Sequence, residues 1–219
     1  MDGKRDSETK ARLLQVAREV FSELGPEHGT IRKICTSARL NVAAVNYHFG
    51  SKERLYLAVI SDYLEQKQQL FPHNREAAPD APPEERLRSF VRSLLSQFLN
   101  EADLTSQRLG RLVTHEFIEP SSEQCRKILE RHCRPSHAML LEILRAMLPG
   151  VDAATVSRCA VSIVGQCLLT GFAGSSMSVL DPALAFNSGD LDAIVGFILE
   201  FSLGGIVRLG AGGGNMKGC

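Results

Sequence analysis

The chain has 219 residues, of which 44% are hydrophobic and 23% are charged, so it is long and apolar enough to fold around a core and is not a disordered chain. Its 25 Lys and Arg residues balance 25 Asp and Glu residues, which excludes nucleic-acid binding through net charge alone. The first ten residues, MDGKRDSETK, lack the apolar segment of a signal peptide, so we expect a cytoplasmic protein whose six cysteines are free thiols.

The N-terminal region contains three helical patterns. Apolar residues recur at helical spacing over residues 8–24, which predicts an amphipathic helix that ends at Gly25 and Pro26. Thr30 and Asn41 have the side chains of N-caps and predict a second and a third helix, both short. A turn of about three to four residues would join these two helices, which is helix-turn-helix spacing. All three helices would close one small core.

The remainder of the chain also has helical patterns. A fourth helix is expected from Lys52 to about residue 70, followed by a loop with four prolines within residues 72–85. No segment alternates with the period of a strand, so the predicted fold class is all-α. Five further helices are expected at about residues 84–101, 104–118, 122–147, 153–178 and 190–208.

Two stretches of the C-terminal half are unusual in composition. Residues 159–180 carry no charge, which is a property of membrane spans. Their Ser, Thr, Gly and Gln residues are too numerous for lipid, however, and favour close helix packing in a protein interior or a dimer interface. Residues 211–219 are rich in glycine and are expected to be disordered.

The third helix has the side chains expected of a recognition helix. In a helix-turn-helix, the second helix of the pair enters the major groove of DNA. Val42, Ala43 and Ala44 are small enough for the start of this helix to approach base edges and thymine methyl groups. Asn46 offers both a donor and an acceptor, for which adenine is the natural match. These four residues are therefore the predicted base-reading residues.

The residues that follow are suited to phosphate. Tyr47, His48 and Lys52 would lie at the edge of the groove, where hydroxyl, imidazole N–H and ammonium groups bind phosphate oxygens. Residues 28–54 hold five Lys or Arg residues against Glu53 alone, a local charge of +4 that suits a phosphate-facing surface. The alternative is a three-helix core with an incidental solvated face, which leaves Tyr47 and His48 without a role.

The segment TIRKICTSARLNVAAVNYHFGSKERLY, residues 30–56, resembles the DNA-binding head of the TetR/AcrR family of bacterial repressors, and the resemblance extends over about residues 9–60. It implies base reading by residues 42–46. Two positions depart from the family pattern, Arg39 in place of a usual Gly in the turn and Asn46 in place of a usual Tyr. A left-handed backbone at Arg39 would cost about 1 kcal/mol. The resemblance implies phosphate contacts by Thr30, Arg32, Tyr47, His48 and Lys52.

The C-terminal half carries a looser resemblance. The stretches THEFIEPSSEQ, HCRPSHAMLLEILRAMLPG and AVSIVGQCLLTGF, within residues 114–172, resemble a subgroup of that family linked to cefoperazone and chloramphenicol sensitivity. Membership implies a homodimer whose last two long helices pair into a four-helix bundle, and an effector cavity among the middle helices. The domains would be a DNA-binding domain at 1–52, a ligand-binding and dimerisation domain at 53–210, and the tail at 211–219.

Candidate ligand-binding residues in the second domain are Arg111, His115 and Gln166. The segment HEFIE starts like the zinc motif HExxH but ends in Glu119 instead of His, so we expect no metal, and a solvated His115–Glu119 pair is favoured over a site for a metal or a cationic effector. Gln166 is either a hydrogen-bonding group across the dimer or a polar anchor in a pocket, the former being slightly favoured.

No phosphate-binding loop, dinucleotide fingerprint or nucleophile elbow is present, so we expect no catalytic residue and no cofactor. The sequence predicts a ligand-responsive bacterial regulator, with repression favoured, that binds an inverted-repeat operator as a homodimer and is released by a small molecule. One alternative is a helical interaction protein whose head no longer binds DNA because Arg39 disrupts the turn. A remote alternative is an enzyme that uses His115 and Glu116.

Overall fold

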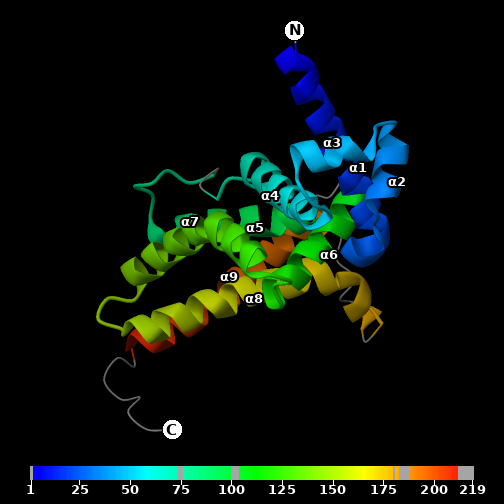
Figure 1. Ribbon diagram of the computed structural model, residues 1–219. Helices are drawn as coiled ribbons and strands as arrows, with labels where there is room; N and C mark the ends of the chain where they lie inside the picture. The colour runs from blue at the N-terminus through cyan, green and yellow to red at the C-terminus, as the bar shows by residue number, and fades with distance from the viewer. Residues whose placement is uncertain (1, 74–75, 100–103, 180, 183–187, 212–219) are drawn as a thin grey trace. The chain divides into compact units, whose positions relative to one another are not determined.

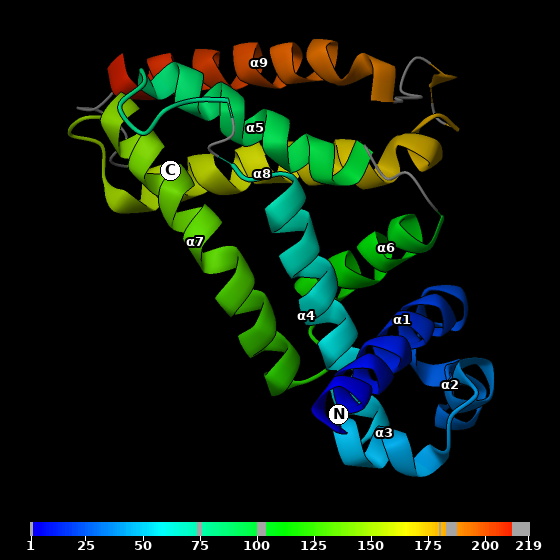
Figure 2. The same cartoon turned by 90° about the horizontal axis from the view of Figure 1, so that it is seen from above.

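The computed structural model describes residues 2–73, 76–99, 104–179, 181–182 and 188–211, and Figures 1 and 2 show it in two views. These residues contain helices and no strand, so the predicted all-α class is confirmed. The predicted tail lies outside the described residues from 212 onward. The helices are α1 (Asp2–His28), α2 (Ile31–Ala38), α3 (Val42–His48), α4 (Lys52–Leu70), α5 (Pro83–Leu99), α6 (Leu104–Ile118), α7 (Glu123–Met147), α8 (Ala153–Met177), the short 3₁₀ helix η2 (Ser188–Asp190) and α9 (Leu191–Ala211).

Helix α1 differs from its predicted extent at its N-terminal end. It begins at Asp2 instead of residue 8. The added turns show no apolar repeat, and among them Lys4 and Arg5 are good helix formers. At Gly25 the backbone leaves helical geometry, with φ 73° and ψ 170°, as expected for a residue without a Cβ atom. Pro26 then starts a last short turn that ends at His28.

The caps of α2 and α3 are those predicted. The Thr30 hydroxyl oxygen accepts a hydrogen bond from the Lys33 N–H at 3.2 Å, and the Asn41 side-chain oxygen accepts one from the Ala43 N–H at 2.9 Å. Each bond satisfies an N–H that the first turn of the helix leaves unpaired. The two helices therefore begin where the sequence places them.

The turn between α2 and α3 closes with a non-glycine residue in the left-handed region. Arg39 has φ 53° and ψ 46° and is the one described non-glycine residue with a positive φ. Its N–H donates to the Thr36 carbonyl at 3.1 Å, and the Leu40 N–H donates to the Cys35 carbonyl at 2.9 Å. These bonds end α2 in the manner of a C-terminal cap. The turn thus forms with Arg39 in place, at the conformational cost of its Cβ atom.

Replacing Arg39 with Gly is therefore expected to raise the free energy of unfolding by about 0.5–1 kcal/mol, because Gly adopts this backbone without the steric cost. Denaturant unfolding of the two proteins measures the difference. Arg39→Ala is the matched control: it removes the guanidinium and keeps the Cβ atom, so it should give no gain. An equal gain in both variants would show that the charge, and not the backbone, is the source of the cost.

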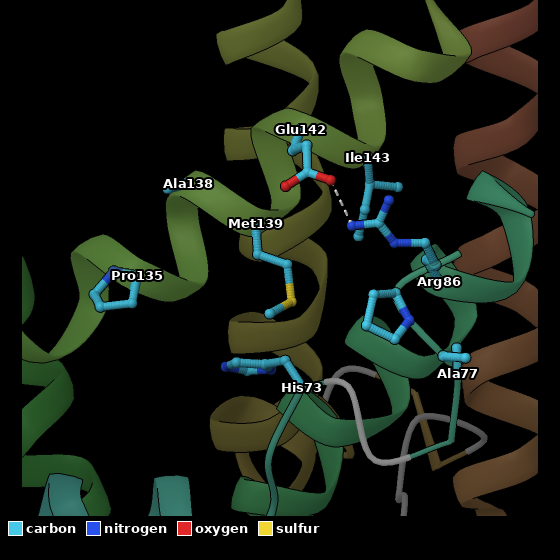
Figure 3. Close-up of a pocket in the computed structure, with 10 residues that line it drawn as sticks. His73, Ala77, Arg86, Pro135, Ala138, Met139, Glu142 and Ile143 are labelled. Carbon is cyan, nitrogen blue, oxygen red and sulfur yellow. Dashed lines mark hydrogen bonds and ion pairs between the residues drawn. The ribbon is translucent and has the colours of Figure 1, made fainter. Parts of the chain in front are cut away.

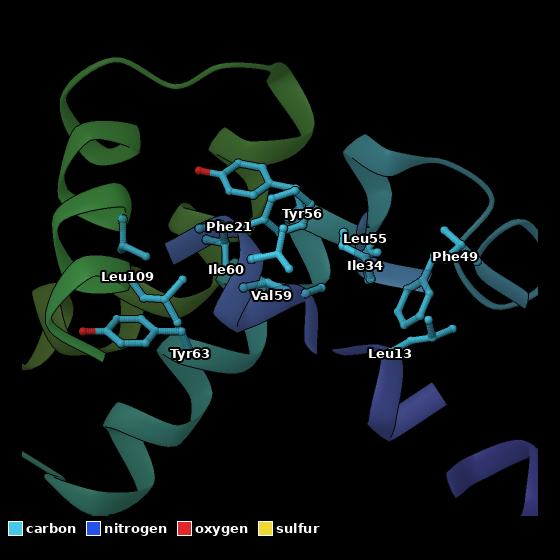
Figure 4. Close-up of a cluster of buried hydrophobic side chains, with 14 of the residues drawn as sticks. Leu13, Phe21, Ile34, Phe49, Leu55, Tyr56, Val59, Ile60, Tyr63 and Leu109 are labelled. Atoms are coloured by element: carbon cyan, nitrogen blue, oxygen red, sulfur yellow. The ribbon is translucent and has the colours of Figure 1, made fainter. Parts of the chain in front are cut away.

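The chain divides into two compact units, and α4 and α7 each pass from one unit to the other along the chain. Unit 1 comprises residues 1–66 and 101–132, and unit 2 comprises residues 67–100 and 133–219. The two units are defined by packing. The boundary expected after residue 52 separates a DNA-binding domain from a ligand-binding domain by function, so it stays a prediction. In unit 1, helices α1 to α3 enclose a core with α6 and the N-terminal part of α4 (Figure 4), formed around Leu13, Phe21, Ile34, Leu55, Ile60 and Leu109.

Unit 2 is built on α5, which packs against both α8 and α9 (Figure 2). Its core includes Leu87 and Leu95 of α5 together with Leu144 of α7. The small residues of α8 have a packing role here, since a Cβ atom added at Gly171 would lie 2.5 Å from the Phe98 Cβ atom. This contact explains part of the uncharged, small-residue composition of the α8 sequence.

Helices α8 and α9 are both long and apolar enough to cross a membrane, judged by length and composition alone. Only 22% of the apolar window at residues 153–171, and 28% of the window at residues 191–211, is buried within the chain. A single copy therefore leaves a large apolar surface on these two helices exposed to water. Such surfaces mark sites of association.

Candidate nucleic-acid interface

The outer face of α3 is exposed and mostly small. Val45 is fully buried in the core of unit 1 and orients the helix, so that Val42, Ala43 and Asn46 lie on the exposed side. Ala44 differs from the other predicted base-reading residues, because it is half-buried and packs against the core. Three of the four predicted base-reading residues therefore share one solvent-facing surface.

Tyr47 extends that surface with a large polar ring. Its side chain is 77% exposed and contacts the His48 ring edge-on, with ring centroids 4.9 Å apart. An exposed tyrosine held by a neighbouring ring is suited to donate its hydroxyl hydrogen to a phosphate oxygen.

Thr30 and Arg32, at the start of α2, are both exposed. The capping bond uses Thr30 as an acceptor only, so its hydroxyl hydrogen is still able to donate. Lys52, at the start of α4, is half-buried, and its ammonium donates to the Glu27 carbonyl at 3.4 Å. This long bond to an uncharged acceptor would yield readily to a phosphate, because hydrogen bonds between ionised groups are stronger.

His48 is placed differently from the surface histidine that the sequence suggests. Its side chain is only 6% exposed, and its Nε2 atom lies 3.8 Å from the Asp6 carboxylate of α1. A phosphate contact through Nε2 would require this atom to leave Asp6. The role of His48 in DNA binding stays a prediction, with the side chain facing α1 in the structure.

Unit 1 contains a buried carboxylate, Glu116, which sequence reasoning named only within the HEFIE segment and did not place in the interior. Glu116 is 3% exposed and accepts hydrogen bonds from the Tyr56 hydroxyl at 3.0 Å, the Ser121 N–H at 2.8 Å and the Cys125 thiol at 3.2 Å. The carboxylate thus joins α4 and α7 to the end of α6. Its position three residues after the buried Val113 is the signal that places it on the inner face of α6.

The electrostatics of this group indicate a structural role. Burial alone would raise the pKa of Glu116, but the hydrogen bonds from Ser121, Cys125 and Tyr56 outweigh it and lower the pKa. Burial and the neighbouring Glu116 charge raise the pKa of Cys125 to about 12. A thiol that stays protonated is a poor nucleophile, so the cluster holds helices together and is not suited to covalent chemistry.

The three predicted ligand-binding residues are not brought together in a single cavity of either unit. Arg111 and His115 lie exposed on α6 in unit 1. Gln166 of α8 lies in unit 2, and its amide nitrogen is 3.5 Å from the Ser202 hydroxyl of α9. The Gln166 side chain lines a hollow with a volume of about 310 Å³. The roles of all three in ligand binding stay predictions.

The hollow beside Gln166 lies on the apolar face of α8 and α9. Phe197 and Phe201 of α9 stack with ring centroids 6.3 Å apart, and both side chains are about 70% exposed. Gly204 and Gly205, one turn further along, have no heavy atom near the position of an added Cβ. Further exposed apolar side chains on these two helices are Val161, Leu169 and Val207.

Comparison with known proteins gives two family matches. Residues 13–59 match the tetR family of bacterial regulatory proteins. Residues 83–206 match the C-terminal domain of the HTH-type transcriptional dual regulator CecR. CecR of Shigella flexneri is 30% identical over 157 residues, which are 68% of this chain and 68% of the relative.

Solved structures share the fold. A bacterial regulatory protein in the tetR family from Rhodococcus RHA1 has a TM-score of 0.66 at 20% identity and covers 90% of this chain and 96% of its own. AibR in complex with isovaleryl coenzyme A and operator DNA has a TM-score of 0.62 at 16% identity and covers 88% of this chain and 97% of its own.

Proposed function

Because this chain belongs to the TetR family of bacterial transcriptional regulators and carries a C-terminal domain of the CecR type, we propose that it is a repressor that binds an inverted-repeat operator as a homodimer and is released by a small molecule. The observation that carries the proposal is the exposed face of α3, with small residues beside Asn46 and Tyr47 on a helix-turn-helix. We assign it a cytoplasmic location and no catalytic role.

In this proposal, α3 enters the major groove. Val42 and Ala43 contact base edges or thymine methyl groups, and Asn46 forms a pair of hydrogen bonds with a base edge, preferably adenine. Thr30, Arg32, Tyr47 and Lys52 hold the phosphates and set the register. Two heads of a dimer would occupy half-sites about 34–36 Å apart, or a multiple of this distance.

The occupant proposed for the apolar face of α8 and α9 is a second copy of the chain. This face combines exposed phenylalanines with glycines, and so offers both apolar area and room for close helix approach. Four helices, two from each copy, would form a bundle around it. The polar pair of Gln166 and Ser202 would lie within that interface and help to define its register.

Release by an effector follows from differential affinity. A ligand that binds unit 2 better in one arrangement of the dimer shifts the population toward that arrangement, and DNA affinity falls by a coupling of about 1–3 kcal/mol. AibR, solved with isovaleryl coenzyme A and operator DNA, has a similar fold, which supports a regulator of this kind. Helix α4 begins in the head and ends in unit 2, so it is the element proposed to transmit the change.

Two substitutions separate base reading from phosphate binding. Asn46→Ala is expected to lose about 1–3 kcal/mol of discrimination at one base pair, whereas Lys52→Ala should weaken binding to all sequences and reduce the salt slope by about one unit. Binding titrations over operator variants at several salt concentrations measure both effects. The same pattern of losses in the two variants would contradict the proposed division between base and phosphate contacts.

A further inference from the structure

Within unit 1, a polar contact joins α1 to α4. The Nη1 atom of Arg18, on α1, donates to the Asp62 carboxylate at 3.0 Å and to the Gln66 side-chain oxygen at 2.7 Å. The Gln66 amide nitrogen in turn donates to the same Asp62 oxygen at 2.9 Å. The three side chains therefore form a closed set of hydrogen bonds, which we call the Arg18 triangle.

The positions of these residues follow from helix geometry. Asp62 and Gln66 are four residues apart on α4, so their side chains lie on one face, a turn apart. Arg18 is half-buried and directly follows Ala17, which is buried in the core of unit 1. A long charged side chain at the border of a core places its stem along apolar neighbours and its charged end on a polar partner.

The Arg18 triangle restricts direction more than the surrounding core does. The Arg18 side chain is 13% exposed and the Asp62 side chain is 29% exposed, so solvent screens this ion pair only in part. The core beside it includes the Phe21 and Tyr56 rings, with centroids 5.3 Å apart (Figure 4). Burial of apolar area favours contact but is non-directional, whereas hydrogen bonds weaken steeply with angle. The triangle is therefore suited to fix the direction of α1 on α4.

Helix α1 carries the rest of the head with it. It packs against both α2 and α3. Leu13 of α1, Ile34 of α2 and Val45 of α3 belong to the same apolar core. A change in the direction of α1 relative to α4 would therefore also turn α3, which carries the predicted base-reading residues.

A second polar contact holds the adjacent position of α4. Ser61 directly precedes Asp62, and its hydroxyl oxygen lies 3.0 Å from His132 Nε2 of α7. Successive residues of a helix point about 100° apart, so α1 and α7 hold α4 from two sides at the same level. Both α4 and α7 continue along the chain into unit 2. The Arg18 triangle thus joins the head to the two helices that leave unit 1.

We propose that the Arg18 triangle fixes the direction of the head on α4 and thereby sets the spacing of half-sites that the homodimer accepts. Arg18 is then a positioning residue and not a DNA contact. One extra base pair between the half-sites moves them about 3.4 Å apart and rotates one against the other by about a tenth of a turn, so heads of fixed direction discriminate against it. The inference rests on the proposed function, because only a dimer on two half-sites selects a spacing.

The test measures this spacing preference with the full-length protein. The operator obtained by selection from random DNA is compared with duplexes that carry one or two inserted base pairs between the half-sites, and with a duplex that carries a single half-site. The wild-type protein should bind the operator about tenfold or more tightly than the duplex with one insertion, because the second head no longer fits. Arg18→Met keeps an unbranched stem and removes the guanidinium. It should lower this ratio to about threefold or less and bind the single half-site as the wild-type protein does.

Asp62→Ala breaks the same triangle from the side of α4 and is the second variant. It should relax the spacing preference to the same extent as Arg18→Met, and the double variant should relax it no further, because both substitutions remove one interaction. Circular dichroism verifies that each variant is folded.

The matched control is Arg86→Met, in unit 2. Arg86 of α5 donates to the Glu142 carboxylate of α7 at 2.8 Å (Figure 3), and its side chain is 17% exposed, close to the value for Arg18. This variant loses an ion pair between helices at similar burial but outside the head. It should therefore keep the wild-type ratio.

Four results would overturn the role of Arg18. They are an unchanged ratio in Arg18→Met and Asp62→Ala, an equal relaxation in Arg86→Met, a wild-type protein that binds all spacings equally, and an equal loss on every duplex including the single half-site. The last result is the mark of a damaged head. A wild-type protein that selects no operator would instead refute the proposed function, and this inference with it.

Discussion

Phe201→Arg is expected to break the proposed homodimer and to lower the affinity for the proposed inverted-repeat operator by about 10²-fold or more, since a monomer loses the gain from binding two half-sites at once. The Phe201 side chain is 68% exposed and stacks with Phe197 on the apolar face of α8 and α9. Placing a guanidinium there would bury an unpaired charge in the proposed interface. The substitution has little effect within one chain, because the ring is mostly in solvent.

Sedimentation and operator titration measure the two effects of Phe201→Arg. The matched control is Phe117→Arg, which places the same charge at an exposed phenylalanine of α6, in unit 1. The control should remain dimeric and bind the operator normally. A dimeric Phe201→Arg protein, or equal losses in both variants, would contradict the proposed interface.

Glu116→Ala is expected to lower the free energy of unfolding by about 1–3 kcal/mol, the range for leaving a buried hydrogen-bond donor without its acceptor. The carboxylate accepts from Tyr56, Ser121 and Cys125, and its loss leaves the Tyr56 hydroxyl and the Ser121 N–H buried without an acceptor. Denaturant unfolding measures the change.

Glu119→Ala is the matched control for Glu116→Ala. Glu119 follows α6 directly and is exposed, so its removal should change stability by less than about 0.5 kcal/mol. Similar losses in the two variants would show that the hydrogen bonds of Glu116 do not hold unit 1 together.

The same carboxylate predicts a pH dependence. The pKa of Glu116 is lowered in the folded protein, so its stabilising contribution is present above the unfolded pKa of about 4.3 and is lost as the pH falls through the lower folded value. As the pH falls from about 4.3 through the lower folded pKa, the stability of the wild-type protein should therefore fall more steeply than that of Glu116→Gln. Parallel curves for the two proteins would exclude Glu116 as the source.

Much of the fold could be predicted because the helix ends carry local signals. Thr30 and Asn41 each cap a helix through their own side chains, and they were recognisable without knowledge of the tertiary structure. The first turns of α1 were missed for the opposite reason. They have few apolar residues, so they show no periodicity although they are helical.

The candidate sites were predictable only where one helix defines them. The exposed face of α3 follows from the burial of Val45 at helical spacing. Two contacts depend on segments far apart in the sequence, that of His48 with Asp6 and that of Glu116 with Tyr56. Periodicity within one element contains no information on such contacts, so sequence reasoning took His48 for a surface residue and did not place Glu116 in the interior.

The most direct test of the proposed function is selection of random duplex DNA by the purified protein at about 0.15 M salt, where non-specific binding is weak, followed by sequencing of the retained DNA. Lys52→Ala serves as a weakened control. Enrichment of an inverted repeat, with less recovery by Lys52→Ala, is the predicted result. A folded protein that enriches no sequence would contradict operator binding and favour a helical protein-interaction module.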